Sequence, residues 1–374
     1  MRALVTDADI PTAVAAIRGL GRGGVETVAY GPQRSAAGRR SRYATVALRG
    51  PQADEDPAAA AGALADAATE HGPLVAYPAT EEAIDAMLAA ERWPGTMPYP
   101  GADPLNAVRD KPGLADLAGA AGLAVPETLA AAPAAELRSH TFGGRCVVKP
   151  LHKGGALAVA RRLDGDELAS LLRALPGTEQ VLVQRETPGS LGAISLVIDR
   201  EGAVAGRVQQ RTLTTWPAEA GPSRRAVTIE PDEPLIAGAA RLLADAGYWG
   251  LAQLQFMGID SGDPRLIDIN PRYYGSLSLA LAAGVNLPAL WHRVVTGEPT
   301  PPAAGYRPGV TYRWVEADIF AALHGDAAAL VRRAERPRTG PMWASDDPRP
   351  SVVMAGQGLA AWLRRRLPGG RDGS

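Results

Sequence analysis

Two apolar segments late in the chain constrain the fold most strongly. Residues 250–257 read GLAQLQFM, and residues 266–272 read LIDINPR. Apolar and polar side chains alternate in both segments, which predicts neighbouring β-strands with one face on a core and the other face open. Gln255, Asp268 and Asn270 would lie together on the open face. The two segments therefore predict a sheet that carries three oxygen-bearing side chains on one face.

Oxygen ligands of this kind suit Mg²⁺ bound to a nucleotide. Asp268 and Asn270 are two residues apart, so they point the same way from one strand, and Arg272 adds a cation two residues later. The alternative is a polar strand face open to water, with Arg272 paired only with Asp268. We favour the metal site because two tyrosines, a glycine and a serine follow Arg272, a loop that suits the close approach of a ligand. This arrangement indicates phosphoryl transfer.

Four further motifs precede these strands along the chain. They lie at residues 110–128, 146–150, 152–155 and 181–186. The first begins with Asp110 and Lys111, which open a predicted helix, and it ends in GLAVPET. The others read CVVKP, HKGG and VLVQRE. In this order, the motifs resemble the ATP-grasp superfamily, and most closely its carbamoyl-phosphate-synthase and biotin-carboxylase-like branch. The resemblance covers roughly residues 104 to 300, and no single motif would suffice for it.

The resemblance implies a role for each motif. Lys111 and Lys149 would bind nucleotide phosphates, a glycine pair would cover them, and a hinge strand would run along adenine; these ATP-binding residues are Lys111, Lys149, Gly154, Gly155, Gln184, Arg185 and Glu186. The metal, Mg²⁺ or alternatively Mn²⁺, would be held by Gln255, Asp268 and Asn270. The catalytic residues would be Arg272, which would neutralise the acyl phosphate, and Arg211, which would face the reacting carboxylate.

The implied activity is that of an ADP-forming carboxylate-amine ligase. In such an enzyme a small carboxylic acid attacks the γ-phosphate of ATP, and an amine then captures the acyl phosphate. An acid-thiol ligase, a kinase and a non-catalytic ATP-binding module are the alternatives, and the last is disfavoured because the predicted lysine, metal and arginine positions are all retained. Two departures from the family pattern are present: Asp268 replaces the usual glutamate, and no acidic residue follows Gly189 where one often anchors ribose.

Three features of the sequence, two in these motifs and one near the N-terminus, also have simpler explanations. Lys149 could be a surface lysine at a strand end, and Lys111 could belong to an ordinary helix start at Asp110. The proline and glycine pair after Lys149 favour a phosphate-binding role. Residues 19–24, GLGRGG, fit a dinucleotide-binding pattern, but they end a predicted helix where that pattern requires a preceding strand. We interpret them as a helix stop.

The length of 374 residues exceeds what a single core sustains, so two or three domains are expected. Short apolar strands near residues 3–6, 27–30 and 74–77 alternate with helices, which predicts a parallel sheet. The predicted fold class is α/β: a Rossmann-like domain at the N-terminus, followed by the two-lobed α+β ATP-grasp fold that the resemblance implies. The predicted segments are an N-terminal domain, a small lobe, a large lobe with the metal site, and an extension with a tail: residues 1–104, 105–187, 188–300 and 301–374.

Composition limits the partners. The net charge is −1 and the pI is about 6.6, so nothing attracts the whole molecule to nucleic acid or to an anionic membrane. The single cysteine excludes an internal disulfide, and no apolar run approaches the length of a membrane span. We therefore expect a cytoplasmic protein with no nucleic-acid or membrane partner, and the resemblance implies an enzyme with small-molecule acid and amine substrates. The extension after residue 300 would either close an acceptor site or support a homodimer.

Overall fold

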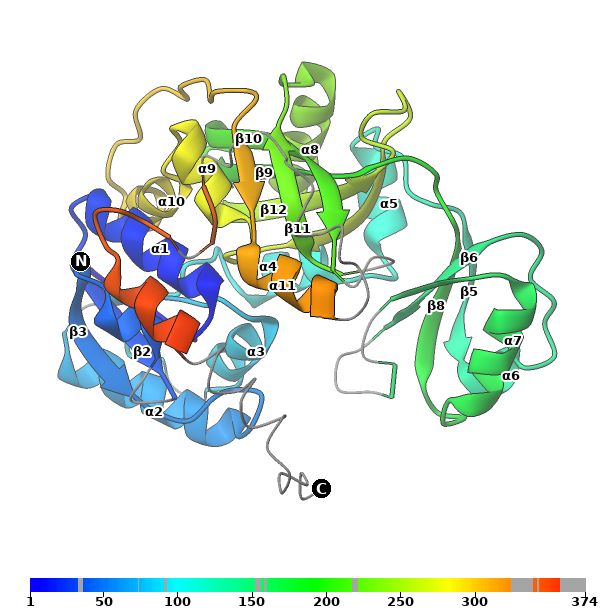
Figure 1. Ribbon diagram of the computed structural model, residues 1–374, viewed down its shortest axis with the longest axis horizontal. Helices are drawn as coiled ribbons and strands as arrows, with labels where there is room; N and C mark the ends of the chain where they lie inside the picture. The colour runs from blue at the N-terminus through cyan, green and yellow to red at the C-terminus, as the bar shows by residue number, and fades with distance from the viewer. Residues whose placement is uncertain are drawn as a thin grey trace. The chain divides into compact units, whose positions relative to one another are not determined.

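The computed structural model describes residues 1–32, 36–72, 74–90, 93–151, 156–157, 160–216, 221–323, 339–341 and 343–356 (Figure 1). The chain forms two compact units. The first unit contains residues 1–98, 272–302 and 338–374, and the second contains residues 99–271 and 303–337. The chain therefore passes between the units more than once, and the predicted division into four consecutive segments remains a prediction.

A parallel sheet forms the centre of the first unit. Its order is β3-β2-β1-β4, and its strands are β1 Arg2–Val5, β2 Thr27–Gly31, β3 Ala44–Arg49 and β4 Leu74–Tyr77. Helices cover both faces, with α1 (Pro11–Arg22) on one face and α2 (Pro57–Glu70) and α3 (Glu81–Ala89) on the other (Figure 1). Every residue of β2 and β4 is consequently buried, as is typical of parallel strands. The strands predicted near residues 3–6, 27–30 and 74–77 are confirmed.

The ends of α1 agree with its sequence. Pro11 occupies the first turn, where its missing N–H removes no helical hydrogen bond. The helix ends at Arg22, and Gly24 follows with a φ of 81°, which only glycine adopts without strain. Gly21 lies where a Cβ would come within 2.5 Å of the Tyr43 side chain. The glycines of residues 19–24 therefore serve a helix stop and close packing, which confirms that interpretation.

Residues 272–302 pack with the first unit through α9 (Leu277–Ala283) and α10 (Leu287–Thr296), both of which contact α1. An aromatic cluster links this segment to β4, because the Trp291 ring lies 4.8 Å from that of Tyr77 and 5.2 Å from that of Tyr273, between centroids. His292 is also buried and contacts the Tyr77 hydroxyl through Nδ1 at 2.9 Å. The first unit thus incorporates a segment that follows the predicted metal strand.

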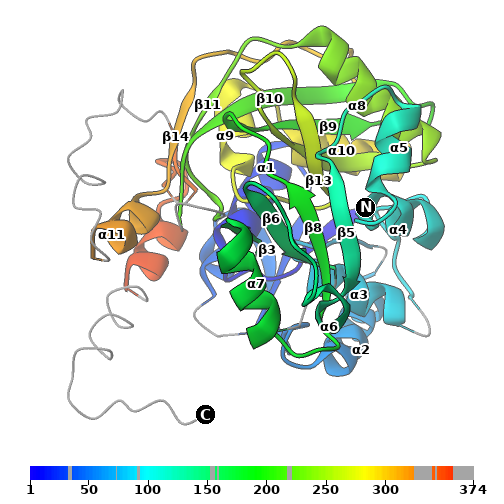
Figure 2. The same ribbon diagram turned by 90° about the vertical axis from the view of Figure 1, so that its right-hand side faces the viewer.

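The second unit contains two antiparallel sheets, which Figure 2 shows from the side. The four-stranded small sheet has the order β5-β8-β6-β7, with β5 Thr128–Pro133, β8 Gln180–Arg185, β6 Cys146–Pro150 and β7 Arg161–Leu163. One of its faces packs on α6 (Ala134–Leu137) and α7 (Gly165–Ala174), where Val148 and Val183 meet Leu168 and Leu172. Cys146 is fully buried on this face. The opposite face of the small sheet does not pack on these two helices.

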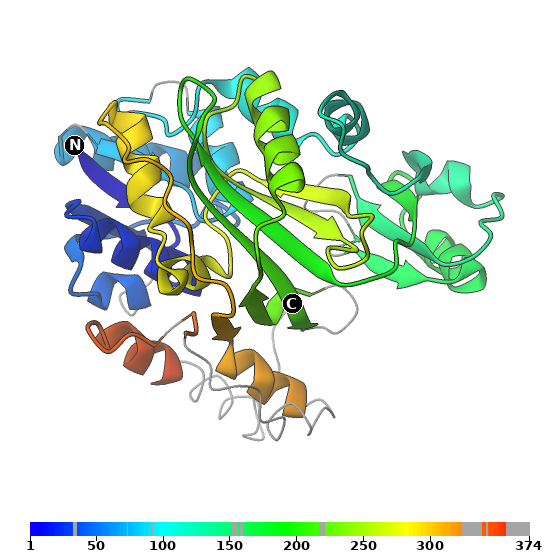
Figure 3. The same cartoon turned by 90° about the horizontal axis from the view of Figure 1, so that it is seen from above.

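The six-stranded large sheet has the order β13-β12-β9-β10-β11-β14, and its strands are β13 Arg265–Asn270, β12 Gly250–Met257, β9 Leu191–Ile198, β10 Val204–Thr215, β11 Ser223–Thr228 and β14 Thr311–Arg313. Figure 3 shows the structure from above, with the strands of this sheet in green, yellow and orange. Helix α8 (Glu233–Asp245) contacts β9. Asp232 caps its N-terminus, because the Asp232 side chain accepts a hydrogen bond from the Leu235 N–H at 3.1 Å. The two strands predicted late in the chain are confirmed as neighbours.

One predicted helix start is wrong. Helix α4 (Ala102–Arg109) ends just before Asp110, and α5 (Leu114–Ala120) begins after a turn. Asp110 therefore does not open a helix; its carboxylate accepts a hydrogen bond from the Gly113 N–H at 3.0 Å within the turn. Aspartate stabilises such turns as readily as it caps helices, which is why the sequence did not distinguish them.

The described parts of the extension belong to both units. Strand β14 pairs with β11, and α11 (Val315–Leu323) follows it in the second unit, where Asp318 is buried against Arg224 and Arg225 at 3.1 and 2.9 Å. In the first unit, Asp347 is buried and lies 3.0 Å from Arg18. Among the described residues, no helix is both long and apolar enough to cross a membrane. The predicted α/β fold class, with a parallel-sheet part followed by antiparallel sheets, is confirmed.

Candidate functional site

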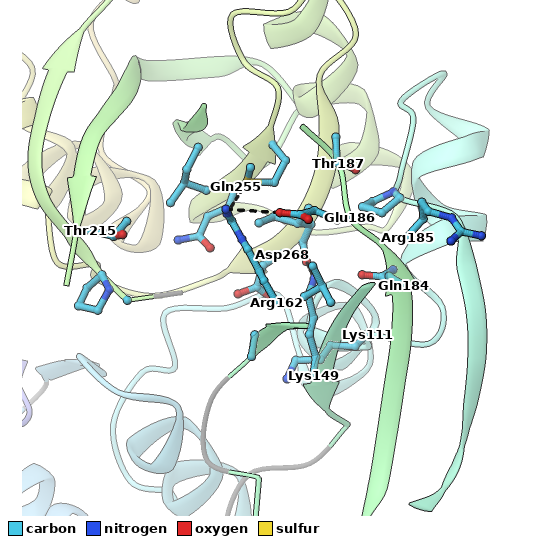
Figure 4. Close-up of a pocket in the computed structure, with 18 of the residues that line it drawn as sticks. Lys111, Lys149, Arg162, Gln184, Arg185, Glu186, Thr187, Thr215, Gln255 and Asp268 are labelled. Atoms are coloured by element: carbon cyan, nitrogen blue, oxygen red, sulfur yellow. Dashed lines mark hydrogen bonds and ion pairs between the residues drawn. The ribbon is translucent and has the colours of Figure 1, made fainter. Parts of the chain in front are cut away.

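A cavity of about 370 Å³ lies in the second unit, between the small sheet and the large sheet (Figure 4). The alternation of side chains along the strands determines which residues line the cavity. In β6, Cys146 and Val148 face the core with α7, so Val147 and Lys149 face the cavity. The cross-strand partners of Val147 are Arg162 and Gln184, which line the cavity too.

The lining carries more positive than negative charge. Among the described residues that line it, the cationic side chains are Lys111, Lys149, Arg162 and Arg185, and the carboxylates are Glu186 and Asp268. These described residues leave two positive charges in excess in a concave and partly apolar site. Such a cavity suits an anionic ligand with an apolar part.

Lys149 is partly buried and contacts the large sheet. Its Nζ donates a hydrogen bond to the Ile267 carbonyl at 3.1 Å. The register of β12 and β13 shifts after Gln255, a bulge that places Ile267 outside the regular pairing. Burial lowers the pKa of Lys149, and the negative charge of Asp268 opposes that shift. The Nζ of Lys111 donates to the Pro150 carbonyl at 3.0 Å, so the cavity receives two ammonium groups, as phosphate binding requires.

The predicted metal ligands meet on the large sheet. Gln255 is the cross-strand partner of Asp268, and both line the cavity. The Asn270 amide lies 3.5 Å from an Asp268 oxygen, and Asn270 is largely buried. A carboxylate and two amide carbonyls provide the hard oxygen donors that Mg²⁺ prefers, so the residues fit this ion. Among the described residues, no group of three or more His, Cys, Asp or Glu forms another metal site.

The hinge strand brings one unsatisfied acceptor to the cavity. Gln184 is 7% exposed, and its Nε2 donates to the Thr128 hydroxyl at 3.4 Å. Its Oε1 is buried and has no hydrogen-bond partner among the described residues. A buried acceptor without a partner is costly unless a ligand donates to it, and the amino group of adenine is a donor of this kind. Gln184 therefore fits the nucleotide base.

The neighbouring hinge residues are ion-paired. Glu186 lies 2.6 Å from Arg145 and 3.8 Å from Arg162, and Arg185 lies 3.4 Å from Glu127. Both Arg185 and Glu186 line the cavity, and their roles beside adenine remain predictions. Gly154 and Gly155 lie outside the described residues.

The two predicted catalytic arginines have other partners within their own units. Arg211 lies 3.6 Å from Asp260 in the second unit and does not line the cavity. Arg272 lies in the first unit, where its Nε donates to Glu81 at 2.7 Å. The roles of Arg211 and Arg272 in catalysis therefore remain predictions.

Sequence reasoning missed Arg162. A strand of three residues, β7, is too short to show periodicity, and the pairing of Arg162 with Val147 is a tertiary property. The sequence also gave no signal for further polar lining residues, namely Thr187, Thr215 and Ser223.

Comparisons with known proteins agree with this geometry. A family model described as "ATP-grasp in the biosynthetic pathway with Ter operon" matches residues 197–318. N5-carboxyaminoimidazole synthetase from Staphylococcus aureus has a similar structure, with a TM-score of 0.65 and 12% identity over 87% of this chain and 86% of that one. No curated protein matches the chain by sequence.

Two other solved structures are similar. The biotin carboxylase domain of 2-oxoglutarate carboxylase from Hydrogenobacter thermophilus has a TM-score of 0.63 and 16% identity over 83% of this chain and 73% of that one. The L-amino acid ligase from Bacillus licheniformis has a TM-score of 0.60 and 16% identity over 83% of this chain and 78% of that one. The chain has the ATP-grasp fold, and its resemblance to the ATP-grasp superfamily is confirmed.

Proposed function

We propose that this protein is an ATP-dependent ligase that activates a small carboxylic acid as an acyl phosphate and couples it to an amine. One observation carries the proposal: a single cavity joins two lysines of the small-lobe side to Gln255 and Asp268 of the large sheet. Phosphoryl transfer needs this combination, because its catalysis is mainly positioning and charge stabilisation. The similarity to an L-amino acid ligase and to N5-carboxyaminoimidazole synthetase supports the reaction class.

We assign ATP and Mg²⁺ as cofactors, with Mn²⁺ as an alternative ion. Lys111 and Lys149 bind the nucleotide phosphates, and Gln184 accepts from the base. Gln255, Asp268 and Asn270 would hold the metal, which when bound neutralises phosphate charge. The Hydrogenobacter thermophilus domain was solved with MgADP and bicarbonate, which supports this assignment.

The reaction balances in two steps. A carboxylate oxygen of the acid attacks the γ-phosphorus of ATP, the bond to the β-phosphate oxygen breaks, and ADP leaves. The amine then attacks the acyl carbon, phosphate leaves, and the amine loses a proton. Arg272 offsets charge on the acyl phosphate, and Arg211 orients the acid. A thiol in place of the amine gives a thioester by the same route.

The partners of the reaction are small molecules in this proposal. The Hydrogenobacter thermophilus domain was described as a dimer, so we include a homodimer in the proposal. The proposed location is the cytoplasm, as the single cysteine suggests. Light scattering on the purified protein measures the mass in solution, and a monomeric mass over the working concentration range contradicts the dimer.

The function is tested by measuring ADP release from Mg·ATP in the presence of pooled amino acids, peptides and sugar acids. The expected result is acid-dependent ADP release, a hydroxamate when hydroxylamine is added, and an adduct mass equal to acid plus amine minus water. Tight ATP binding without acid-dependent release supports a non-catalytic ATP-binding module. A stable phosphorylated product with no adduct supports a kinase.

A further inference from the structure

Arg162 projects into the cavity from β7 and crosses it. Figure 4 shows the side chain running toward Gln255, with its guanidinium group beside Glu186. One guanidinium nitrogen lies 3.6 Å from the Met257 sulfur. Since β7 belongs to the small sheet and Met257 to the large sheet, Arg162 spans the space between the two walls.

The contacts of Arg162 are too weak to explain this position as structural. A thioether sulfur is a poor acceptor, and the pair with Glu186 is long, at 3.8 Å, with Arg162 33% exposed. Glu186 has a closer partner in Arg145 at 2.6 Å. Arg162 can therefore leave Glu186 without stranding a carboxylate, so the arrangement allows it to move to a ligand.

The opposite wall explains why a further cation is useful. Gln255 and Asp268 line this wall, and Asn270 lies beside Asp268. The three side chains provide oxygen donors but only one negative charge, so they bind a divalent cation less strongly than a set of carboxylates would. The phosphates of a nucleotide then depend more on cations supplied by the chain. Lys111 and Lys149 are two such cations, and Arg162 is a third inside the same cavity.

We propose that Arg162 is a nucleotide-binding residue whose guanidinium leaves Met257 and Glu186 to bind phosphate oxygens of the nucleotide. A guanidinium presents paired donors that match phosphate oxygens. The position of Arg162, between the hinge residue Glu186 and the metal ligand Gln255, directs it to the phosphates near the ribose. This inference deepens the proposed function and rests on the cavity being a nucleotide site.

The chain provides a matched control. Arg161 is adjacent on the same short strand, but it pairs in register with the core residue Val148 and is exposed. Arg161→Ala therefore removes one positive charge from β7 without changing the cavity lining. Arg162→Met removes the charge of Arg162 and keeps most of the length of its side chain.

The test measures the affinities of ADP and adenosine by calorimetry and competition, in EDTA and with Mg²⁺, for the wild type and for Arg162→Met, Arg162→Lys and Arg161→Ala. We expect Arg162→Met to weaken ADP binding at least tenfold in EDTA while adenosine affinity changes less than twofold. Arg162→Lys should recover part of the loss, and Arg161→Ala should bind ADP like the wild type. Equal melting temperatures establish that the variants are folded.

Three results would overturn the inference. Wild-type ADP affinity in folded Arg162→Met removes Arg162 from the site and leaves the proposed function intact. Equal losses for adenosine and ADP place Arg162 on the base, away from the phosphates. Absence of ADP and ATP binding in the wild type overturns both this inference and the proposed function, so the two failures are distinguishable.

Discussion

The two units bury their sheets differently, and this difference decides where chemistry can occur. In the parallel sheet of the first unit, β2 and β4 are buried at every residue. In the second unit, β6 alternates between buried and partly exposed residues. A sheet covered on both faces offers polar side chains only at its ends, whereas a sheet covered on one face offers every second residue. The cavity accordingly lies between the open face of the small sheet and the part of the large sheet where Gln255 and Asp268 are only partly buried.

Buried carboxylates extend the comparison. Asp318 in the second unit and Asp347 in the first are each buried against arginine. Asp7, at the carboxyl end of β1, is held instead by hydroxyls, with Thr6 at 2.5 Å and Thr80 at 3.1 Å. Burial raises the pKa of Asp7 to about 6. A carboxyl group whose negative charge is poorly compensated thus lies at the carboxyl ends of the strands of the parallel sheet.

The largest effect on turnover should come from Asp268 on the large sheet. We expect Asp268→Asn to reduce turnover by about 10³-fold, because the variant removes the one negative charge of the donor set and with it metal-dependent charge stabilisation. The melting temperature should change little, since Asp268 faces a cavity. ADP release measured over a series of Mg²⁺ concentrations checks this. Asp263→Asn, in an exposed pair with Arg265 on the neighbouring loop, is the control. Near wild-type release by Asp268→Asn at limiting Mg²⁺ would contradict the metal assignment.

The next effect concerns the first unit, which contains Arg272. We expect Arg272→Ala to lower kcat by about 10²-fold and to raise the KM for ATP less, because the arginine offsets charge that is larger in the transition state. Hydroxylamine should trap an acyl phosphate in the wild type and not in the variant. If KM rises while kcat is unchanged, Arg272 acts only in ground-state binding.

The same variant has a structural consequence that needs a control. Arg272 pairs with Glu81 at 2.7 Å, with both side chains mostly buried, so its loss leaves a mostly buried carboxylate with one partner fewer. Glu81→Gln tests this separately. A kcat loss in Glu81→Gln equal to that in Arg272→Ala would indicate that the ion pair, and not the arginine at the reacting group, is responsible.

The sequence predicted what alternation and strand ends reveal. Gln255 and Asp268 were predicted as neighbours because one face of their strands is apolar, and the structure pairs them. Lys149 was predicted from the resemblance and from the proline and glycine pair that follow it. It lies in the cavity, and its binding to phosphate stays a prediction. Arg162 was not predictable, because its position depends on which strand pairs with β6. The packing of residues 272–302 with the first unit depends similarly on an aromatic cluster formed by residues distant in sequence.

A smaller effect is expected on the small sheet. Lys149→Ala should weaken Mg·ATP binding about tenfold, or about 1.4 kcal/mol. Burial lowers the pKa of Lys149, so the unfolded chain holds its proton to higher pH, and the stability of the wild type should rise as pH increases toward 10.5. Lys149→Met should lose that rise. Unchanged ATP affinity by calorimetry in folded Lys149→Ala would remove this lysine from the phosphate site.

The smallest effect tests the edge of the parallel sheet, where turnover is not the readout. Because burial raises the pKa of Asp7 from 3.8 to about 6, the fold favours the protonated acid; its stabilising contribution is complete below pH 3.8 and is lost as the pH rises through about 6. Asp7→Asn should therefore stabilise the protein at pH 8 and not at pH 4. The gain should be about 1 kcal/mol, less than the shift alone implies, because asparagine accepts from both threonines but must bury an amide N–H. Asp7 has a φ of 53°, which asparagine tolerates well.

Urea unfolding at pH 4 and pH 8 measures the change in stability, with exposed Asp66→Asn as the control. An equal gain in stability at pH 4 would show that the negative charge of Asp7 does not cause the gain. The two sheets would then differ in how their strands are buried and not in how well their buried carboxylates are compensated.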